Sequence, residues 1–204
     1  SIRNIKQHLD LIAGLPGEDL KSFKKSFNDV YSIRPEEIQL GFLKLLRGSS
    51  MREEAHEYEM KYSPYPPYEI LSTKDISYDE LNLLKKVEHM VDKYYNSQKF
   101  DNIIKYFEPK FDTPFEMFYS LSRFFDEKGY FNRNIGNNEY YKVFLDFNSK
   151  IIKEDNHILR DIIRYDYLSS NKRRGMPEFL VSKIDKSEEE KIKEKYRGEY
   201  SFRD

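Results

Sequence analysis

Cysteine is absent from the 204-residue chain, and this absence excludes several kinds of site. Without thiols, these residues form no disulfide and offer no thiolate ligand to a metal. The four histidines stand far apart in the sequence and form no close pair, so they give no support to a histidine-based metal site: His8, His56, His89 and His157. A chain without cysteine fits the reducing cytoplasm, where we expect the protein to reside.

Long apolar runs and an excess of positive charge are also absent. No stretch approaches the roughly 18 consecutive apolar residues that a membrane-spanning helix needs, and no signal peptide opens the chain. The formal net charge of -1 lacks the basic excess typical of nucleic-acid-binding proteins. The basic run 172–174 and the tyrosines beside Lys93 would suit a single strand, but a tyrosine-rich core with surface lysines explains them as well. We favour the core explanation, and retention on heparin or single-stranded DNA would test the alternative.

Aromatic residues are abundant, at 16% of the chain, and they predict a well-formed hydrophobic core. The length suits one domain, or a small domain with an appendage. The first residue is Ser1, and the opening fifty residues have the pattern of the middle of a fold. We therefore expect the chain to begin inside a longer protein; a processed amino terminus is the alternative.

A strand, a helix and a second strand are predicted at the start of the chain. Residues His8–Gly14 form a short apolar run that ends at a Gly/Pro turn. A helix is expected from Glu18 to Ile33, and Arg34-Pro35 ends it. The next apolar run, Glu37–Leu46, predicts a strand parallel to the first, in one right-handed βαβ unit. Mostly apolar strands predict a sheet that is covered on both faces.

Beyond residue 50 the pattern becomes helical. A short charged helix is expected over Arg52–Met60, followed by a proline-rich aromatic connector. Ser77 and Thr113 each open a capping box, with helices that run to about Gln98 and Glu127. Further helices are expected at 138–153, 156–169 and 185–204.

The predicted fold class is mainly α with a small βαβ remnant. The domains are a partial TIM-type barrel of two parallel strands at 1–61, the connector at 62–76, and a helical domain at 77–204. Two parallel strands leave ladder groups without partners. We therefore expect the open edge to be covered by the chain's own connector or by a second copy of the chain.

The first candidate site is the loop Gly14-Leu-Pro-Gly17, which follows a strand and leads into a helix. Ligands of parallel α/β proteins bind at the carboxyl ends of the strands, and glycines let the backbone approach them closely. A plain tight turn explains the same residues equally well.

Several segments together resemble a known family. The motif Asp10-Leu-Ile-Ala-Gly-Leu-Pro-Gly-Glu18 resembles the fifth strand of radical S-adenosylmethionine barrels, and residues 39–49 resemble the sixth. The resemblance continues through Pro66-Pro-Tyr-Glu-Ile-Leu71 and Ile163-Arg-Tyr-Asp-Tyr-Leu168. It points to the group with an amino-terminal cobalamin-binding domain, iron–sulfur oxidoreductases that are also labelled, by analogy, magnesium-protoporphyrin monomethyl ester oxidative cyclases. In this group the carboxyl-terminal helical domain has no assigned role.

The resemblance implies positions for a cofactor site. Ile12 would lie against the adenine of S-adenosylmethionine, and Gly14 would let the chain pass close to it. The backbone at Leu45 and Leu46 would touch the same adenine. For Ile12, Leu45 and Leu46, core packing is the alternative explanation. The sequence has Asp10 where the family pattern often has glycine.

The resemblance also implies what this chain lacks. The family holds its 4Fe-4S cluster with three cysteines spaced C-x-x-x-C-x-x-C, and none is present here. We therefore expect the parent to be the enzyme, with S-adenosylmethionine, a cluster and cobalamin, while this piece binds no cofactor alone and is inert. Its partners would be the missing half of the barrel and the cobalamin domain. The alternative is a non-enzymatic helical module that binds a partner or regulates one.

Lys44 is the remaining candidate, for contact with substrate. It lies near the carboxyl end of the second predicted strand, an odd number of residues from Gln39, so the two should face opposite sides. The alternative, which we favour, is a lysine whose stem is buried while its ammonium group reaches water.

Overall fold

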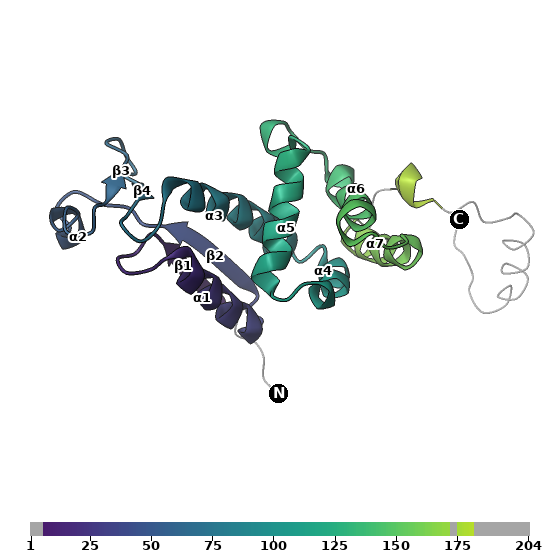
Figure 1. Cartoon of the computed structure of the whole chain (residues 1–204). Helices are drawn as coiled ribbons and strands as arrows, with labels where there is room; N and C mark the ends of the chain where they lie inside the picture. The colour runs from purple at the N-terminus through teal and green to yellow at the C-terminus, as the bar shows by residue number, and fades with distance from the viewer. Residues whose placement is uncertain (1–5, 172–174, 182–204) are drawn as a thin grey trace, which may run out of the picture.

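The computed structural model describes residues 6–171 and 175–181. In Figure 1 a two-stranded sheet with one helix lies in one part of the molecule, α3 runs beside it, and the remaining helices follow toward the other end. The predicted fold class is confirmed: the chain is mainly helical, with a two-stranded parallel sheet and no closed barrel in the described residues. The helix predicted at 185–204 lies outside the described residues.

The βαβ unit is present at the start. Strand β1 (His8–Ala13), helix α1 (Leu20–Ile33) and strand β2 (Glu37–Phe42) follow one another, and the strands pair in parallel from His8↔Glu37 to Ala13↔Phe42. Helix α1 begins two residues later than predicted, because the Asp19 side chain accepts a hydrogen bond from the Ser22 amide and caps the helix.

The second strand is shorter than predicted. Strand β2 ends at Phe42, and Lys44 forms only an isolated antiparallel bridge with Glu69. The reason is that β1 ends at Ala13 and Gly14 turns away with φ +86, so the chain beyond Phe42 has no strand beside it on that side. It pairs with the connector instead: the Leu43 carbonyl accepts from the Ile70 amide at 2.8 Å.

The predicted charged helix and extended connector also need correction. Helix α2 (Ser50–Glu53) is short and is followed by turns, so no helix covers Arg52–Met60. The connector contains an antiparallel pair, β3 (Lys61–Tyr62) and β4 (Ile70–Ser72). Three prolines lie in the loop between these strands, where no ladder amide is needed.

The described part of the helical region contains the helices predicted before residue 170 and one further α-helix. The side chains of Ser77 and Thr113 each cap a helix, as expected. Only Ser77 forms a full capping box, in which the Glu80 side chain accepts from the Ser77 amide in return. A helix that was not predicted, α4, lies between them. The elements are α3 (Tyr78–Met90), η1 (Val91–Asn96), α4 (Asp101–Phe107), η2 (Glu108–Lys110), α5 (Pro114–Glu127), η3 (Tyr130–Asn132), α6 (Asn137–Phe147), η4 (Asn148–Ile152), α7 (His157–Ser170) and η5 (Glu178–Leu180).

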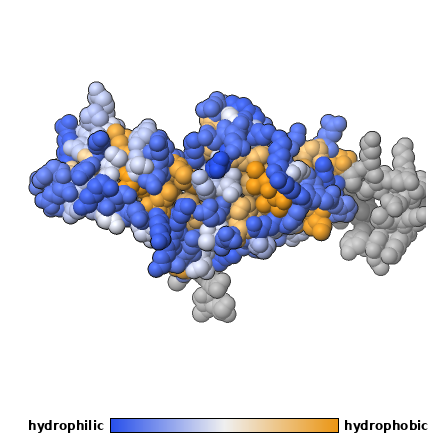
Figure 2. All heavy atoms as spheres, viewed as in Figure 1, coloured by the Kyte–Doolittle hydropathy of each residue, from blue (hydrophilic) through white to orange (hydrophobic). Residues whose placement is uncertain are grey.

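Aromatic side chains form much of the core, as the composition predicted. Phe27 of α1 packs edge-on against Phe115 and Phe118 of α5, which joins the βαβ unit to the helices. A second group around Tyr94 joins η1 to α6, with the rings of Tyr94 and Phe144 4.7 Å apart. Figure 2 shows apolar residues reaching the surface over β2 and α3 and over α6 and α7. No helix in the described part of the chain is long and apolar enough to cross a membrane.

Candidate functional site

The parallel sheet has one covered face and one open face. Side chains alternate along each strand, so Leu11 and Leu40 point into the core while Asp10 and Gln39 point outward. Ile12 lies on the open face and is 45% exposed. The expectation of a sheet covered on both faces is therefore wrong for the described residues. An uncovered face is unusual for parallel strands, which are normally buried on both sides.

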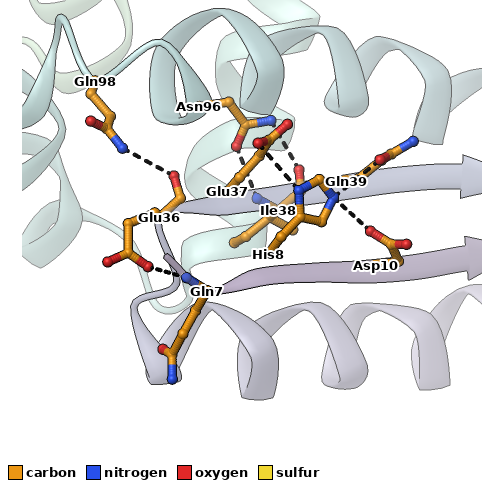
Figure 3. Close-up of polar contacts among 9 residues, drawn as sticks. All are labelled: Gln7, His8, Asp10, Glu36, Glu37, Ile38, Gln39, Asn96 and Gln98. Atoms are coloured by element: carbon orange, nitrogen blue, oxygen red, sulfur yellow. Dashed lines mark hydrogen bonds and ion pairs between the residues drawn. The ribbon is translucent and has the colours of Figure 1, made fainter. Parts of the chain in front are cut away.

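A polar cluster lies at the amino half of the open face (Figure 3). The His8 ring lies between two carboxylates, with Nε2 2.8 Å from Asp10 and Nδ1 3.2 Å from Glu37. Nε2 is also 3.1 Å from the Gln39 side-chain oxygen. Desolvation lowers the pKa of His8, but the hydrogen bond with Gln39 and the charges of Glu37 and Asp10 outweigh it and leave the pKa raised.

The outer edge of β2 is closed by side chains from the helical region. The Asn96 amide accepts from the Ile38 N–H and donates to the Ile38 carbonyl, both at 3.0 Å, and so takes the place of a neighbouring strand at that residue (Figure 3). Two residues before Ile38, the Glu36 carbonyl accepts a hydrogen bond from the Gln98 side chain at 3.3 Å. At the far end, the Leu45 amide donates to the Tyr68 carbonyl at 2.9 Å. The helical region thus bonds to this edge at Ile38 and the connector bonds to the chain beyond Phe42, while no hydrogen bond from the described residues reaches the outward groups of Leu40 and Phe42.

The outer edge of β1 has no such cover among the described residues. In a parallel ladder, alternate residues direct both backbone groups to the neighbouring strand. The Gln7 and Ala13 carbonyls accept from β2 and its extension, so the odd-numbered residues of β1 face β2. The N–H and C=O groups of His8, Asp10 and Ile12 therefore face away, and no hydrogen bond reaches them from residues 6–171 or 175–181.

The Gly/Pro loop at the carboxyl end of β1 is occupied by the fold itself. A Cβ at Gly14 would lie 2.8 Å from Cγ2 of Ile70, so glycine is needed there for packing against β4. The Gly17 amide donates to the Asp75 carboxylate at 2.9 Å. Gly14 lets a neighbour approach closely, as the resemblance implied, but in this structure that neighbour is Ile70.

The other predicted site residues lie near the same edge in different surroundings. Leu45 is fully buried, with its amide bonded to Tyr68 and its carbonyl bonded to Arg52 at 3.0 Å. Leu46 is 56% exposed and lies past the strand rather than in it. Lys44 is also exposed and lies past the end of the strand. The prediction that Lys44 and Gln39 face opposite sides of one strand therefore does not apply.

The structure adds residues that the sequence analysis did not select. His8 was considered only as a metal ligand and Asp10 only as a departure from a motif, yet the two form an ion pair on the open face. Asn96 gave no sequence signal, because its partner Ile38 is 58 residues away. Within the described ranges, no group of three or more histidine or carboxylate side chains is arranged to hold a metal.

A separate hollow of about 210 Å³ lies at the amino end of β2, away from the Gly/Pro loop. An ion pair between Arg34 and Glu108 lies along its wall, and the Tyr31 hydroxyl donates to Glu108 at 2.5 Å. Burial raises the pKa of Glu108, but the bonds from Arg34 and Tyr31 outweigh it and leave the pKa lowered. Since Arg34, Tyr31 and Glu108 satisfy one another, this hollow is better explained as a structural junction.

The fold and its open strand define a class: a parallel α/β unit with one bare edge, joined to a helical region. Comparison with known proteins places the chain more closely. Residues 56–204 match the family described as "Protein of unknown function (DUF4080)", and the chain belongs to this family.

A shorter match links the chain to a curated protein. Over 53 residues, or 26% of the chain, it is 36% identical to the oxygen-independent coproporphyrinogen-III oxidase-like protein HemZ of Bacillus subtilis (strain 168). The matched stretch covers 11% of that protein, so the chain spans about a tenth of this relative. At the coarse level, this match agrees with the resemblance to radical S-adenosylmethionine proteins; it carries no information about cobalamin.

Proposed function

We propose that this chain is the carboxyl-terminal part of a radical S-adenosylmethionine oxidoreductase, and that its parallel strands form part of the wall around the cofactor. The observation that supports this most directly is the asymmetry of the sheet. Asn96 bonds to the edge of β2 at Ile38 and the connector pairs with the chain beyond β2, whereas no hydrogen bond from the described residues reaches the edge of β1, and Asp10 and Ile12 are exposed on the outward face of the sheet. Such a sheet is suited to extension by further strands from the same polypeptide.

The comparisons support the same class. The motif at Asp10–Glu18 resembles a barrel strand of this class, and the HemZ match is to an oxidase-like protein. The partners we propose are therefore the rest of the barrel and a cobalamin-binding domain, both within the parent. A homodimer through β1 is the alternative for the isolated chain. We place the parent in the cytoplasm, since an iron–sulfur enzyme requires reduced thiols.

Of the proposed cofactors, the residues of this chain fit only the adenine of S-adenosylmethionine. A 4Fe-4S cluster needs thiolates, and the chain has none, so it contributes no ligand to the cluster. The open face suits an adenine better: Ile12 is exposed there and pairs across the ladder with Gly41, which leaves the surface beside it free of a side chain. Ile12 and Leu46 are the apolar residues that we assign to the adenine of S-adenosylmethionine.

The chemistry of the parent follows from the cofactor and not from this chain. Bound elsewhere in the parent, a reduced cluster would supply one electron for the reductive cleavage of S-adenosylmethionine, with methionine released. This chain's own residues would shape the adenine pocket and exclude water from it. An oxidative-cyclase type of reaction is the finer proposal, and it rests on the family resemblance alone.

The test is to read and express the coding sequence upstream of Ser1 together with this chain. We expect a C-x-x-x-C-x-x-C motif, an electron paramagnetic resonance signal of a reduced 4Fe-4S cluster, and 5′-deoxyadenosine formed from S-adenosylmethionine. The absorption spectrum of the purified protein would show whether cobalamin is bound. A parent without the three cysteines, whose residues 72–204 capture a partner alone, would support the helical binding module instead.

Gly41 offers a sharper test of the adenine site. A Cβ at this position would lie no closer than 3.7 Å to its nearest neighbour, the Leu11 carbonyl, so the fold has room for a side chain. In the parent, Gly41→Val should leave the free energy of unfolding unchanged or slightly increased. It should weaken S-adenosylmethionine binding about tenfold or more. Unchanged binding in a folded Gly41→Val protein would exclude the open face as the adenine site.

A further inference from the structure

Two arginines just beyond the carboxyl end of β2 have no acidic partner. Arg47 and Arg52 form no ion pair with any described residue, although Arg34, Arg133 and Arg164 each have one. Glu69 of the connector is already paired with Lys85. Glu53, the last residue of α2, and Glu54 follow Arg52 directly but pair with neither arginine.

Both guanidinium groups lie over the same ring. Arg47 is 5.5 Å and Arg52 is 4.8 Å from the centroid of Tyr68, and Arg52 is also 5.0 Å from that of Tyr62. A cation–π contact holds a guanidinium group through its charge and leaves its N–H donors available for hydrogen bonds. Arg52 uses one of these donors on the Leu45 carbonyl at 3.0 Å, which fixes its orientation. We name Arg47, Arg52, Tyr62 and Tyr68 the arginine–tyrosine cluster.

The ring that carries the arginines is itself held in place. Tyr68 has a left-handed backbone, with φ +58, and its amide donates to the Tyr65 carbonyl at 2.8 Å. Its own carbonyl accepts from the Leu45 amide at 2.9 Å. The backbone that carries the Tyr68 ring is therefore fixed on both sides, which lowers the entropic cost of holding the ring in place for a ligand.

The cluster lies at the functional edge of the sheet. The arrowhead of β2 points toward the end of the molecule that carries α2, β3 and β4 (Figure 1), and ligands of parallel α/β proteins bind beyond the carboxyl ends of the strands. Lys44, which is exposed, lies in the same segment. On the side shown in Figure 2, this end of the molecule is mostly hydrophilic, as expected for an edge that meets a polar ligand rather than an apolar partner.

We propose that the arginine–tyrosine cluster binds the carboxylate or phosphate group of a small ligand at the carboxyl edge of the sheet. The planar fork of an arginine guanidinium matches the paired oxygens of either group. If the parent is the enzyme proposed above, this ligand is its substrate, and the substrate carries an anionic group. That identification rests on the proposed function, whereas anion binding by the cluster does not.

The test uses the 204-residue chain and two small anions, pyrophosphate and citrate. In nuclear magnetic resonance titrations we expect the Nε–Hε signals of Arg47 and Arg52 to shift and saturate. Tighter binding of pyrophosphate would assign a phosphate, and tighter binding of citrate a carboxylate. Arg47→Gln should weaken binding about tenfold, since it removes hydrogen bonds to a charged group. Arg47 forms no hydrogen bond within the described residues, so the variant should fold normally.

Arg123→Gln is the matched control, because it removes one exposed positive charge from α5, where Arg123 pairs only with Glu127. It should change the affinity by less than twofold. The proposal is overturned if neither arginine signal shifts, if Arg123→Gln weakens binding as much as Arg47→Gln, or if only a single-stranded DNA dodecamer shifts them. A parent without cysteines would remove the proposed function but leave these shifts unchanged, so the two failures are distinguishable.

Discussion

At the scale of single residues, the two glycines of the Gly/Pro loop differ in what surrounds them. Both have positive φ, but only at Gly14 would an added Cβ lie too close to a neighbour, the Ile70 side chain. Gly17→Ala should cost about 1 kcal/mol of unfolding free energy from backbone strain alone. Gly14→Ala should cost about 2–4 kcal/mol, because crowding against Ile70 adds to that strain. Urea denaturation of the two variants measures the difference, and equal losses would show that Ile70 does not require the glycine.

His8 gives a prediction about pH. Its pKa is raised by Gln39, Glu37 and Asp10 against the lowering effect of desolvation, so the protonated ring is the form that these groups stabilise. This stabilisation is fully present below the unfolded pKa of about 6.5 and is lost as the pH rises through the raised folded value. An imidazole titration should place the pKa of His8 above 6.5, with a lower value in Asp10→Asn. Equal values in the two proteins would contradict the ion pair.

Some residue roles were open to prediction from sequence and others were not. Ser77 and Thr113 were found because a cap and its helix are neighbours in the chain. The Arg47–Tyr68 contact joins residues far apart in sequence, and no local pattern marks it. The positions assigned to the adenine came from the family resemblance, and their exposure could only be read from the structure.

At the scale of elements, the central feature is the closure of the β2 edge by η1. Asn96→Ala would leave the Ile38 N–H and C=O without their partners beside a buried strand, at a cost of about 1–3 kcal/mol. The control is Gln98→Ala, since exposed Gln98 makes one longer bond to a loop carbonyl. It should cost less than about 0.5 kcal/mol. Thermal unfolding compares the two, and an Asn96→Ala protein as stable as the control would refute this closure.

Periodicity predicted β1, α1, α3 and α5, because each has an apolar stripe or run set by its own residues. It failed for β3 and β4, which are very short and depend on each other for pairing. It also made β2 too long, since the apolar run continues through Leu46 while the partner strand stops at Ala13. Strand length was thus decided by a neighbour and not by the run itself.

At the scale of the whole molecule, the sheet and the helices are one packed body with one incomplete side. Phe27 of α1 packs on α5 and Asn96 bonds to Ile38, so the helical region packs against α1 and along the outer edge of β2. The opposite edge and the outward face have polar and apolar groups that no described residue covers. The boundary that we proposed between residues 61 and 77 is therefore a boundary in sequence across which the packing continues.

Amide hydrogen exchange along β1 tests this account most directly. In the monomeric 204-residue chain, the amides of His8, Asp10 and Ile12 should exchange rapidly, while those of Leu9, Leu11 and Ala13, which face β2, are protected. In the parent protein both sets should be protected, because a further strand pairs with the outer edge. If the first set is protected in the monomer, or is still unprotected in the parent, the proposal that β1 joins the rest of a barrel is contradicted.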